Sequence, residues 1–412
     1  MDESVSLNSQ LRIAKRNVGI LTAAQAILGS VAPLSFSLGG LAGYQLLEAD
    51  KSLATAPLTG FNVGVALGAV GVAIAAKLFG RKVSFMIGAV SAAVGGLVAT
   101  LALFKMDFWL FALGLLLIGL SSGFTQKIRF AAADVSPSFF KGEAISWILA
   151  GGIVSAIVGP QLAIWMKDLF EPVLFAGAFV ALVPLALLAI GVLSFVHLPI
   201  ISSQERAEAQ RPRPLSEIIL TQRFATGMIC GICTYALMTF MMTGAPLAMV
   251  IGCGFSSDQA TLGIQWHVIA MFGPSFFTGK LIRRFGAEKV VMAGLLVLMA
   301  CALVAHAGIE LWNFWAALVL LGIGWNFGFI GATAIVASSY RPEEADKVQG
   351  FHDIVLFSTV ALSSFSSGKV FSAYGWSVMN LVIWPVTLVC LVLVVLQIAK
   401  AKAKAKAPQS VN

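Results

Sequence analysis

The sequence has few charged residues and few of the side chains that build soluble catalytic sites. Only 11% of its 412 residues are Asp, Glu, Lys or Arg and only four are His, whereas 58% are hydrophobic. A soluble domain carries about a quarter charged residues and under half apolar ones, so this chain has too much apolar surface for a soluble fold. It also lacks zinc motifs, nucleophile constellations and phosphate-binding loops, which argues against an enzyme. The composition predicts a membrane-embedded protein that needs no cofactor.

The five cysteines and the net charge exclude two further classes. All five cysteines lie in apolar runs, without the pairing of a disulfide framework. Cys230 and Cys233 form the sequence CGIC, but no histidine or carboxylate stands near them, so we interpret them as small helix-packing residues rather than as metal ligands. The net charge of +8 comes from short basic bursts between apolar runs. Such bursts are signals of membrane topology and do not indicate nucleic-acid binding.

Apolar runs that could cross a membrane follow one another along the whole chain. A hydrocarbon core of about 30 Å needs roughly 20 helical residues. This measure predicts an all-α integral membrane protein with twelve transmembrane helices, at residues 17–43, 52–79, 83–104, 108–134, 143–166, 172–198, 222–251, 257–281, 288–307, 311–338, 348–372 and 376–399.

One long polar segment divides these helices into two sets of six. It contains proline and many charges, which are typical of a linker. We therefore expect five parts: an N-terminal segment 1–16, a six-helix bundle 17–198, a linker 199–221, a second bundle 222–399 and a basic tail 400–412. Lys and Arg concentrate in both ends, the linker and the even-numbered loops, so we expect these parts to be cytoplasmic and the chain to lie in the cytoplasmic (inner) membrane.

The two halves have related sequences. AAKLFGRKVSFMIGAV follows the second span and GKLIRRFGAEKVVMAG follows the eighth, which aligns Gly80 with Gly286 at an offset of 206 residues. LIGLSSGF and LLGIGWNFGF align Gly119 with Gly322 at an offset of 203 residues. A near-constant offset on matching spans indicates a duplicated six-helix unit, and two parallel repeats are typical of one transporter architecture.

These features resemble the major facilitator superfamily over essentially the whole chain. That family has a loop signature of the form G-x-L-x-D-R-x-G-R-R, and residues 73–82 read AIAAKLFGRK, with Lys77 at the position of the signature Asp. The resemblance implies a cytoplasmic latch, for which we expect four gate residues: Lys77, Arg81, Asp134 and Arg284. Of these, Asp134 at the inner end of the fourth span is the natural partner of Arg81.

Two cations lie unexpectedly within the fourth span, in the stretch GFTQKIRFAAAD. Lys127 is about 10 Å deeper than Asp134 on a continuous helix, and Arg129 points about 200° away from Lys127. A charge at this depth costs up to about 3 kcal/mol, so we expect a role for each. We expect Lys127 to line a central cavity and Arg129 to contact a neighbouring helix. The alternative is that both belong to the gate.

Other polar and aromatic residues also recur at membrane depth. Polar groups facing lipid would be costly, so we expect them to face inward, and the aromatic rings offer flat faces to a heterocyclic ligand. The predicted substrate-binding residues are Gln25, Asn62, Gln126, Lys127, Arg129, Trp147, Tyr235, Gln265, Trp266, Trp325 and Asn326.

Coupling to an ion gradient needs a titratable group inside the membrane. His267 is the deepest candidate, since histidine titrates near neutral pH. Asp353 is a second candidate, with a gate role as its alternative. We expect proton coupling, and the sequence leaves sodium open.

The sequence therefore predicts a secondary active transporter, acting as a monomer in the lipid bilayer on a small anionic or heterocyclic solute. The alternatives are a drug or metabolite efflux antiporter of the same fold and, more distantly, a membrane enzyme or a non-transporting sensor.

Overall fold

The computed structural model describes residues 2–137, 139–198, 213–341 and 344–406. The predicted linker therefore lies outside the described residues from 199 to 212, as does the tail from 407. The helices are, in chain order, α1 (Asp2–Leu28), α2 (Val31–Leu46), α3 (Ala56–Phe79), α4 (Arg81–Lys105), α5 (Phe108–Thr125), α6 (Ile128–Asp134), α7 (Lys141–Met166), α8 (Ala176–Val180), α9 (Leu182–Ser194), α10 (Leu215–Ile219), α11 (Gln222–Leu247), the π-helical η2 (Ala248–Gly252), α12 (Ser257–Phe272), α13 (Ser275–Phe285), α14 (Ala287–Ala307), α15 (Leu311–Ala337), α16 (Ala345–Leu381) and α17 (Ile383–Lys406).

The described residues contain ten helical stretches that are long and apolar enough to span a membrane. The last of them, Lys347–Lys400, has 54 residues, more than twice the roughly 20 that one crossing needs. Gly375 interrupts it with a non-helical φ of 71°, between the predicted eleventh and twelfth spans. The helices α12 and α13 are individually short but together supply the predicted eighth span. The prediction of an all-helical protein with twelve crossings is confirmed.

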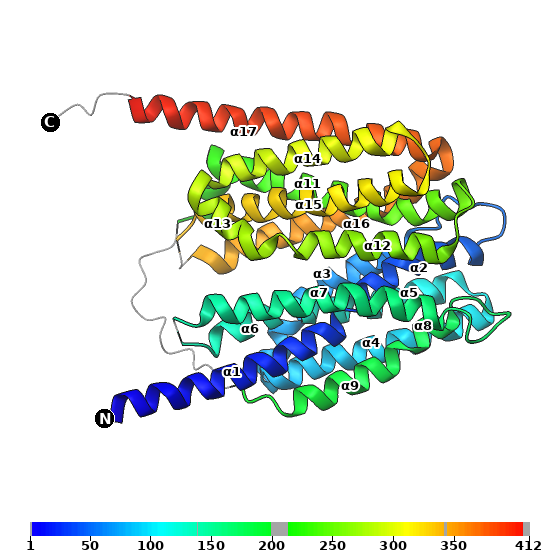
Figure 1. Ribbon diagram of the computed structural model, residues 1–412, viewed down its shortest axis with the longest axis horizontal. Helices are drawn as coiled ribbons and strands as arrows, with labels where there is room; N and C mark the ends of the chain where they lie inside the picture. The colour runs from blue at the N-terminus through cyan, green and yellow to red at the C-terminus, as the bar shows by residue number, and fades with distance from the viewer. Residues whose placement is uncertain (1, 138, 199–212, 342–343, 407–412) are drawn as a thin grey trace.

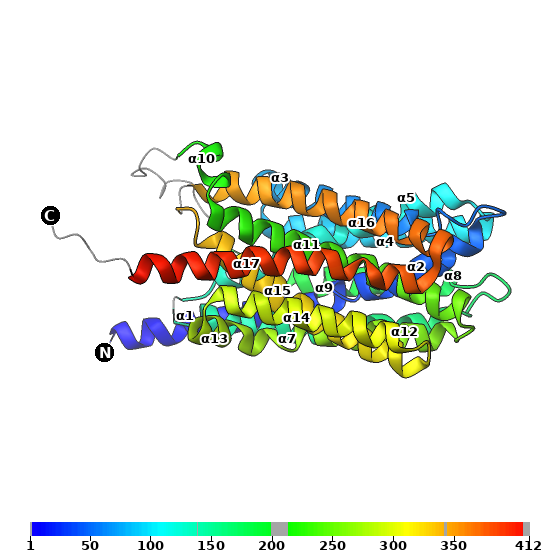
Figure 2. The same cartoon turned by 90° about the horizontal axis from the view of Figure 1, so that it is seen from above.

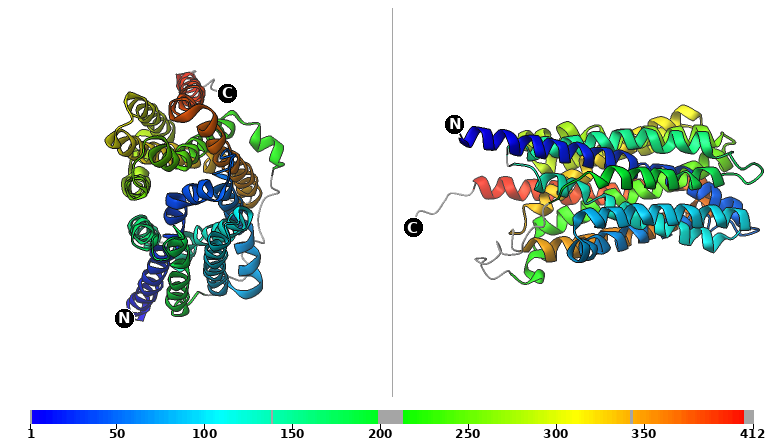
Figure 3. Two further views of the ribbon diagram at one scale, coloured as in Figure 1. Left: turned by 90° about the vertical axis from the view of Figure 1, so that its right-hand side faces the viewer. Right: turned by 90° about the horizontal axis from the view of Figure 1, so that it is seen from below.

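The helices run along the long axis of the molecule and form two bundles (Figures 1 and 2). In Figure 1 most of the first half of the chain, from blue α1 to green α9, lies below most of the second half, which runs from green α11 to red α17. The end-on view in Figure 3 shows the two groups facing each other. The start of α1 and the end of α17 lie at the same end of the bundles, which we call the N/C end, and the other is the opposite end (Figure 1).

The glycines that align in the sequence have the same structural role in each half. Gly80 and Gly286 each separate two helices, with φ values of 82° and 88°. Only glycine adopts this conformation without strain. A Cβ at Gly119 would lie 1.9 Å from the Phe61 carbonyl oxygen, and one at Gly322 would lie 2.5 Å from the His267 carbonyl oxygen. Both therefore allow close helix packing, α5 on α3 and α15 on α12.

The first, fourth and eighth spans are broken at Gly29–Ser30, at Gln126–Lys127 and at Gly273–Pro274, respectively. Pro274 has no N–H and clashes with the preceding turn, which explains the third break. In the fourth span, Thr125 donates its hydroxyl to the Ser121 carbonyl at 2.9 Å, a contact that bends helices. The Gln126 N–H still bonds four residues back, to Ser122 at 3.1 Å, but the Lys127 N–H bonds only three residues back, to Phe124 at 3.1 Å.

Candidate functional site

The break between α5 and α6 explains the two cations inside the fourth span. The angle of about 200° between Lys127 and Arg129 and the depth of Lys127 hold only for one continuous helix, and α5 ends at Thr125 while α6 begins at Ile128. Lys127 is half-buried at the start of α6, whereas Arg129 is exposed. Both lie near the Phe130 ring, with 5.6 Å from the Lys127 ammonium and 4.8 Å from the Arg129 guanidinium to its centroid.

Arg129 faces the second half of the protein. Its electrostatic partners are Asp353 of α16 and Tyr235 of α11. These interactions place Arg129 on the side of the first half that is turned toward α11 and α16. Arg129, which was expected to contact a neighbouring helix, is thus a cation with electrostatic partners in the second half, and the cavity role of Lys127 stays a prediction.

An aromatic cluster surrounds Tyr235. Its ring centroid lies 5.5 Å from Trp325, 5.1 Å from Phe329 and 6.5 Å from Phe357, each in an edge-to-face arrangement. Trp325 and Phe329 are stacked, with centroids 5.2 Å apart and an interplanar angle of 18°. The cluster joins α11, α15 and α16 on the side that faces Arg129. Sequence reasoning identified Tyr235 and Trp325 and missed the two phenylalanines, which alone carry no signal of a site.

The three consecutive residues predicted on the eighth span point in three directions. Gln265 accepts a hydrogen bond from Gln161 of α7 at 2.8 Å, a contact between the halves. His267 is fully buried, and its Nδ1 lies 2.8 Å from the Leu318 carbonyl of α15. Trp266 is 45% exposed on the face of α12 between these two directions, opposite the fully buried Ile264. Among the described residues, Trp266 makes no ring contact with Tyr235, Trp325, Phe329 or Phe357, so it is not part of the cluster.

The side-chain amide of Asn326 forms three hydrogen bonds within the protein. Its Nδ2 donates to the Met271 carbonyl and to the Ser275 hydroxyl, both at 2.6 Å, and its Oδ1 accepts from Thr278 at 2.6 Å. These bonds hold the break between α12 and α13. In this conformation the Asn326 amide donors are already occupied, and its predicted contact with a substrate stays a prediction.

The remaining predicted polar residues lie in the first half. Asn62 is buried and donates to the Leu58 carbonyl of its own helix at 3.0 Å. Gln25 is half-buried beside the break at Gly29, and Gln126 is exposed at its own break. Trp147 packs edge-to-face on Phe140 at 6.1 Å, beside α1. Of these four residues, Gln126 lies nearest to Arg129 in the sequence.

The predicted gate pair is in contact. An Arg81 guanidinium nitrogen lies 2.6 Å from the Asp134 carboxylate, and both side chains are partly exposed at the N/C end. Lys77 and Arg284 are exposed, and Arg284 lies 5.3 Å over the Phe285 ring. Within the described residues, neither Lys77 nor Arg284 forms an ion pair.

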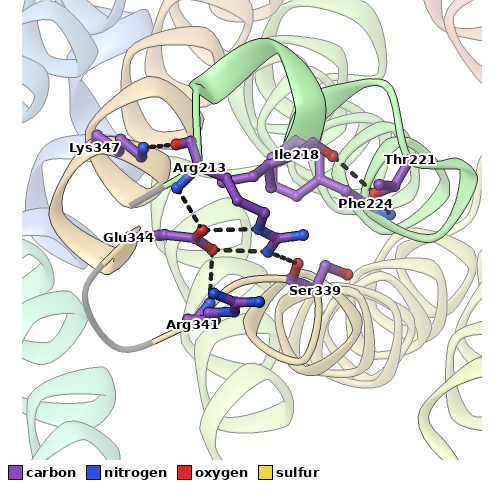
Figure 4. Close-up of polar contacts among 8 residues, drawn as sticks. All are labelled: Arg213, Ile218, Thr221, Phe224, Ser339, Arg341, Glu344 and Lys347. Carbon is purple, nitrogen blue, oxygen red and sulfur yellow. Dashed lines mark hydrogen bonds and ion pairs between the residues drawn. The ribbon is translucent and has the colours of Figure 1, made fainter. Parts of the chain in front are cut away.

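The second half has an ion pair at this end that the sequence did not reveal (Figure 4). Glu344 is fully buried and accepts two bonds of 2.8 Å from the Arg213 guanidinium, with further bonds from the Arg213 and Arg341 amides. Hydrogen bonding to Arg213 holds the pKa of Glu344 far below its usual value. Lys347 donates to the Arg213 carbonyl. Ile218 of α10 and Phe224 of α11 are fully buried and pack against Val336 of α15 and Val348 of α16. This packing attaches the end of the linker to the second half.

Contacts between the halves gather at the opposite end. Lys167, at the end of α7, lies 3.4 Å from Asp258 at the start of α12. The Thr55 hydroxyl is inserted into α16, where it donates to the Ser364 carbonyl at 2.9 Å and accepts from the Gly368 N–H at 3.1 Å. At the N/C end, by contrast, the Arg81–Asp134 pair stays within one half. The halves are thus joined at the opposite end.

A separate groove of about 650 Å³ lies between α1 and α9, with Arg16 at one edge. Its apolar walls include the exposed Leu187, Leu188 and Phe195. Such a wall suits lipid chains, and the groove is remote from the aromatic cluster.

Comparison with known proteins identifies the family. The Major Facilitator Superfamily model matches residues 18–363 and 254–411. The chain is 46% identical over 384 residues to the riboflavin transporter RfnT of Brucella anthropi, covering 93% of this chain and 96% of that protein. It is 26% identical over 399 residues to YddS of Bacillus subtilis, an uncharacterized MFS-type transporter, covering 91% and 89%.

A solved structure agrees. The crystal structure of the nucleoside transporter NupG superposes with a TM-score of 0.67 at 14% identity, covering 93% of this chain and 98% of that one, which shows a shared fold. The chain is therefore a membrane transporter of the Major Facilitator Superfamily.

Proposed function

We propose that this protein transports riboflavin across the cytoplasmic membrane by alternating access. The observation that carries the proposal is the 46% identity to a riboflavin transporter over 93% of the chain. The candidate site is consistent with it, because an aromatic cluster and a cation face each other between the halves.

The chemistry of the cluster suits a flavin. The isoalloxazine ring is flat, tricyclic and rich in carbonyl and ring-nitrogen acceptors. Tyr235 and Phe329 are half-buried, so each has ring surface left for contact with a flat ligand. Arg129 has no carboxylate within ion-pair distance among the described residues, so its guanidinium can donate hydrogen bonds to a ligand. An apolar pocket with a few directed polar groups is the usual form of a small-molecule site.

The asymmetry of the contacts supports alternating access. The halves are joined at the opposite end through Thr55 and α16, and the cationic loops lie at the N/C end. We assign the N/C end to the cytoplasm on the distribution of Lys and Arg. The structure then corresponds to a state in which the site communicates with the cytoplasm.

We propose proton coupling through Asp353 in preference to His267. Asp353 is 38% exposed in its side chain and interacts with Arg129 of the other half, so its surroundings change with the relative position of the halves. His267 is fully buried against α15. A proton would have no path to it without separation of α12 from α15.

Binding of riboflavin to the purified protein tests the proposal. Flavin fluorescence quenching should give saturable binding, and Tyr235→Ala should weaken it at least tenfold. Tyr374→Ala is the matched control, because Tyr374 is 68% exposed and outside the cluster. Absence of saturable binding by the wild-type protein would refute the proposal.

A further inference from the structure

Trp325 is the one tryptophan of α15 whose indole N–H has no partner among the described residues. The other two tryptophans of this helix are satisfied. Trp312 donates to the Glu310 carboxylate at 2.8 Å, and Trp315 donates to the Gln259 carbonyl at 3.0 Å. A buried donor is normally paired, so an unpaired one indicates a partner that the protein itself does not provide.

The position of Trp325 connects this donor to the candidate site. The side chain is only 9% exposed, and Phe329 covers one face of its ring. The Trp325 ring therefore has little free face on which a ligand could stack, which is the role expected from the sequence. The ring of Tyr235, which faces Arg129, contacts Trp325 edge-on at 5.5 Å. Trp325 thus stands directly behind the aromatic surface of the site, with its N–H as its remaining unused group.

We propose that Trp325 is a specificity-determining residue whose indole N–H donates a hydrogen bond to an acceptor in the ring plane of the transported heterocycle. The inference rests on the proposed function, and it names the contact by which a flavin would be selected over a flat hydrocarbon. The N–H is covered in the present conformation, so the ligand must displace part of the ring cluster to reach it. Tyr235 and Phe329, the half-buried members, are the side chains that can move.

The proposed hydrogen bond makes the site selective because a ligand that cannot accept it binds with a free-energy penalty. A ligand without a suitable acceptor leaves the indole N–H buried and unpaired, whereas one with a ring carbonyl or ring nitrogen satisfies it. Sites that are built to hydrogen-bond their ligand reject analogues that lack the partner atom more strongly than apolar pockets reject a change of size.

The test combines protein variants with ligand analogues. Riboflavin binding is measured for the wild-type full chain, for Trp325→Phe and for Trp315→Phe. We expect Trp325→Phe to raise the Kd about tenfold, or about 1.4 kcal/mol. Trp315→Phe, which removes a satisfied N–H from the same helix, should lower thermal stability and leave the Kd unchanged.

Analogues that each lack one acceptor then locate the bond: 1-deaza-, 5-deaza-, 2-thio- and 4-thioriboflavin. One of them should bind the wild type more weakly and be insensitive to Trp325→Phe. If Trp325→Phe fails to fold, 3-benzothienylalanine at position 325 keeps the ring shape and replaces only the N–H by sulfur.

Three results would overturn the inference or its basis, and they are distinguishable. An unchanged Kd on removal of the N–H contradicts the hydrogen bond. An equal loss for riboflavin and all four analogues shows that Trp325 acts through packing. Failure of the wild type to bind riboflavin refutes the proposed function itself, and the inference with it.

Discussion

The contact of Thr55 with α16 makes Gly368→Ala the most informative perturbation of the transport cycle. A Cβ at Gly368 would lie 2.4 Å from the Thr55 hydroxyl oxygen, whereas ordinary contacts begin at 3.4 Å. The halves must therefore separate locally by about 1 Å, and the two hydrogen bonds of Thr55 are lost. Overpacking of this kind costs about 1–3 kcal/mol.

This cost falls on one conformation. The clash exists only while the opposite end is closed, so the mutation should favour the conformation that is open there. A difference of about 1–3 kcal/mol changes the ratio of the two conformations by about 5- to 150-fold. The gain in helix propensity from Gly to Ala is the same in both conformations and cancels between them.

Spin labels across the opposite end measure this ratio. Suitable sites are Leu169 and Ile309, which are 55% and 62% exposed and belong to different halves. Double electron–electron resonance on a cysteine-free background should show a new, longer distance in Gly368→Ala. Gly191→Ala is the matched control, because no atom lies within 4 Å of its added Cβ. An unchanged distance distribution in folded Gly368→Ala would refute the reasoning that this contact holds the opposite end closed.

Three further predictions concern charged and titratable groups. Reversing both charges of Arg81 and Asp134 should restore part of the transport that each single reversal removes, as measured in proteoliposomes, and a double mutant no better than the singles would disprove the gate pair. Asp353→Asn should retain riboflavin exchange and lose accumulation driven by a pH gradient, whereas His267→Gln should retain both; the opposite pattern would make the histidine the coupling group. Because the folded-state pKa of Glu344 is lowered, its stabilising contact is present above the ordinary value of 4.5 and is lost only as the pH falls toward the lowered pKa. The melting temperature should therefore lose no Glu344 contribution between pH 8 and 5, and Glu344→Gln should melt lower than the wild type throughout this range; equal melting temperatures would show that the linker contact adds no stability.

The fold could be predicted well from the sequence because membrane spans and repeats depend on the local composition of the chain. The apolar runs gave the crossings, and the offsets that align Gly80 with Gly286 and Gly119 with Gly322 correspond to shared backbone conformations and shared close contacts. The Arg81–Asp134 contact could also be predicted, because both residues lie at loop positions that match a known family pattern.

The site was less predictable because it depends on helix breaks and long-range contacts. The break at Gln126–Lys127 invalidated the helical angles from which Lys127 was assigned to the cavity. Asn326 was chosen because it is polar at membrane depth, but its amide satisfies groups freed by the break at Pro274. Glu344 and Thr55 were missed because their partners lie more than a hundred residues away.

Riboflavin counterflow in proteoliposomes tests the central claim most directly. Vesicles that contain the purified protein and unlabelled riboflavin are diluted into labelled riboflavin without any ion gradient. We predict a transient accumulation of label above that of protein-free vesicles, abolished by Tyr235→Ala and retained in Tyr374→Ala. Label uptake equal to that of protein-free vesicles, from wild-type protein shown to be folded, would contradict the assignment of riboflavin as the substrate.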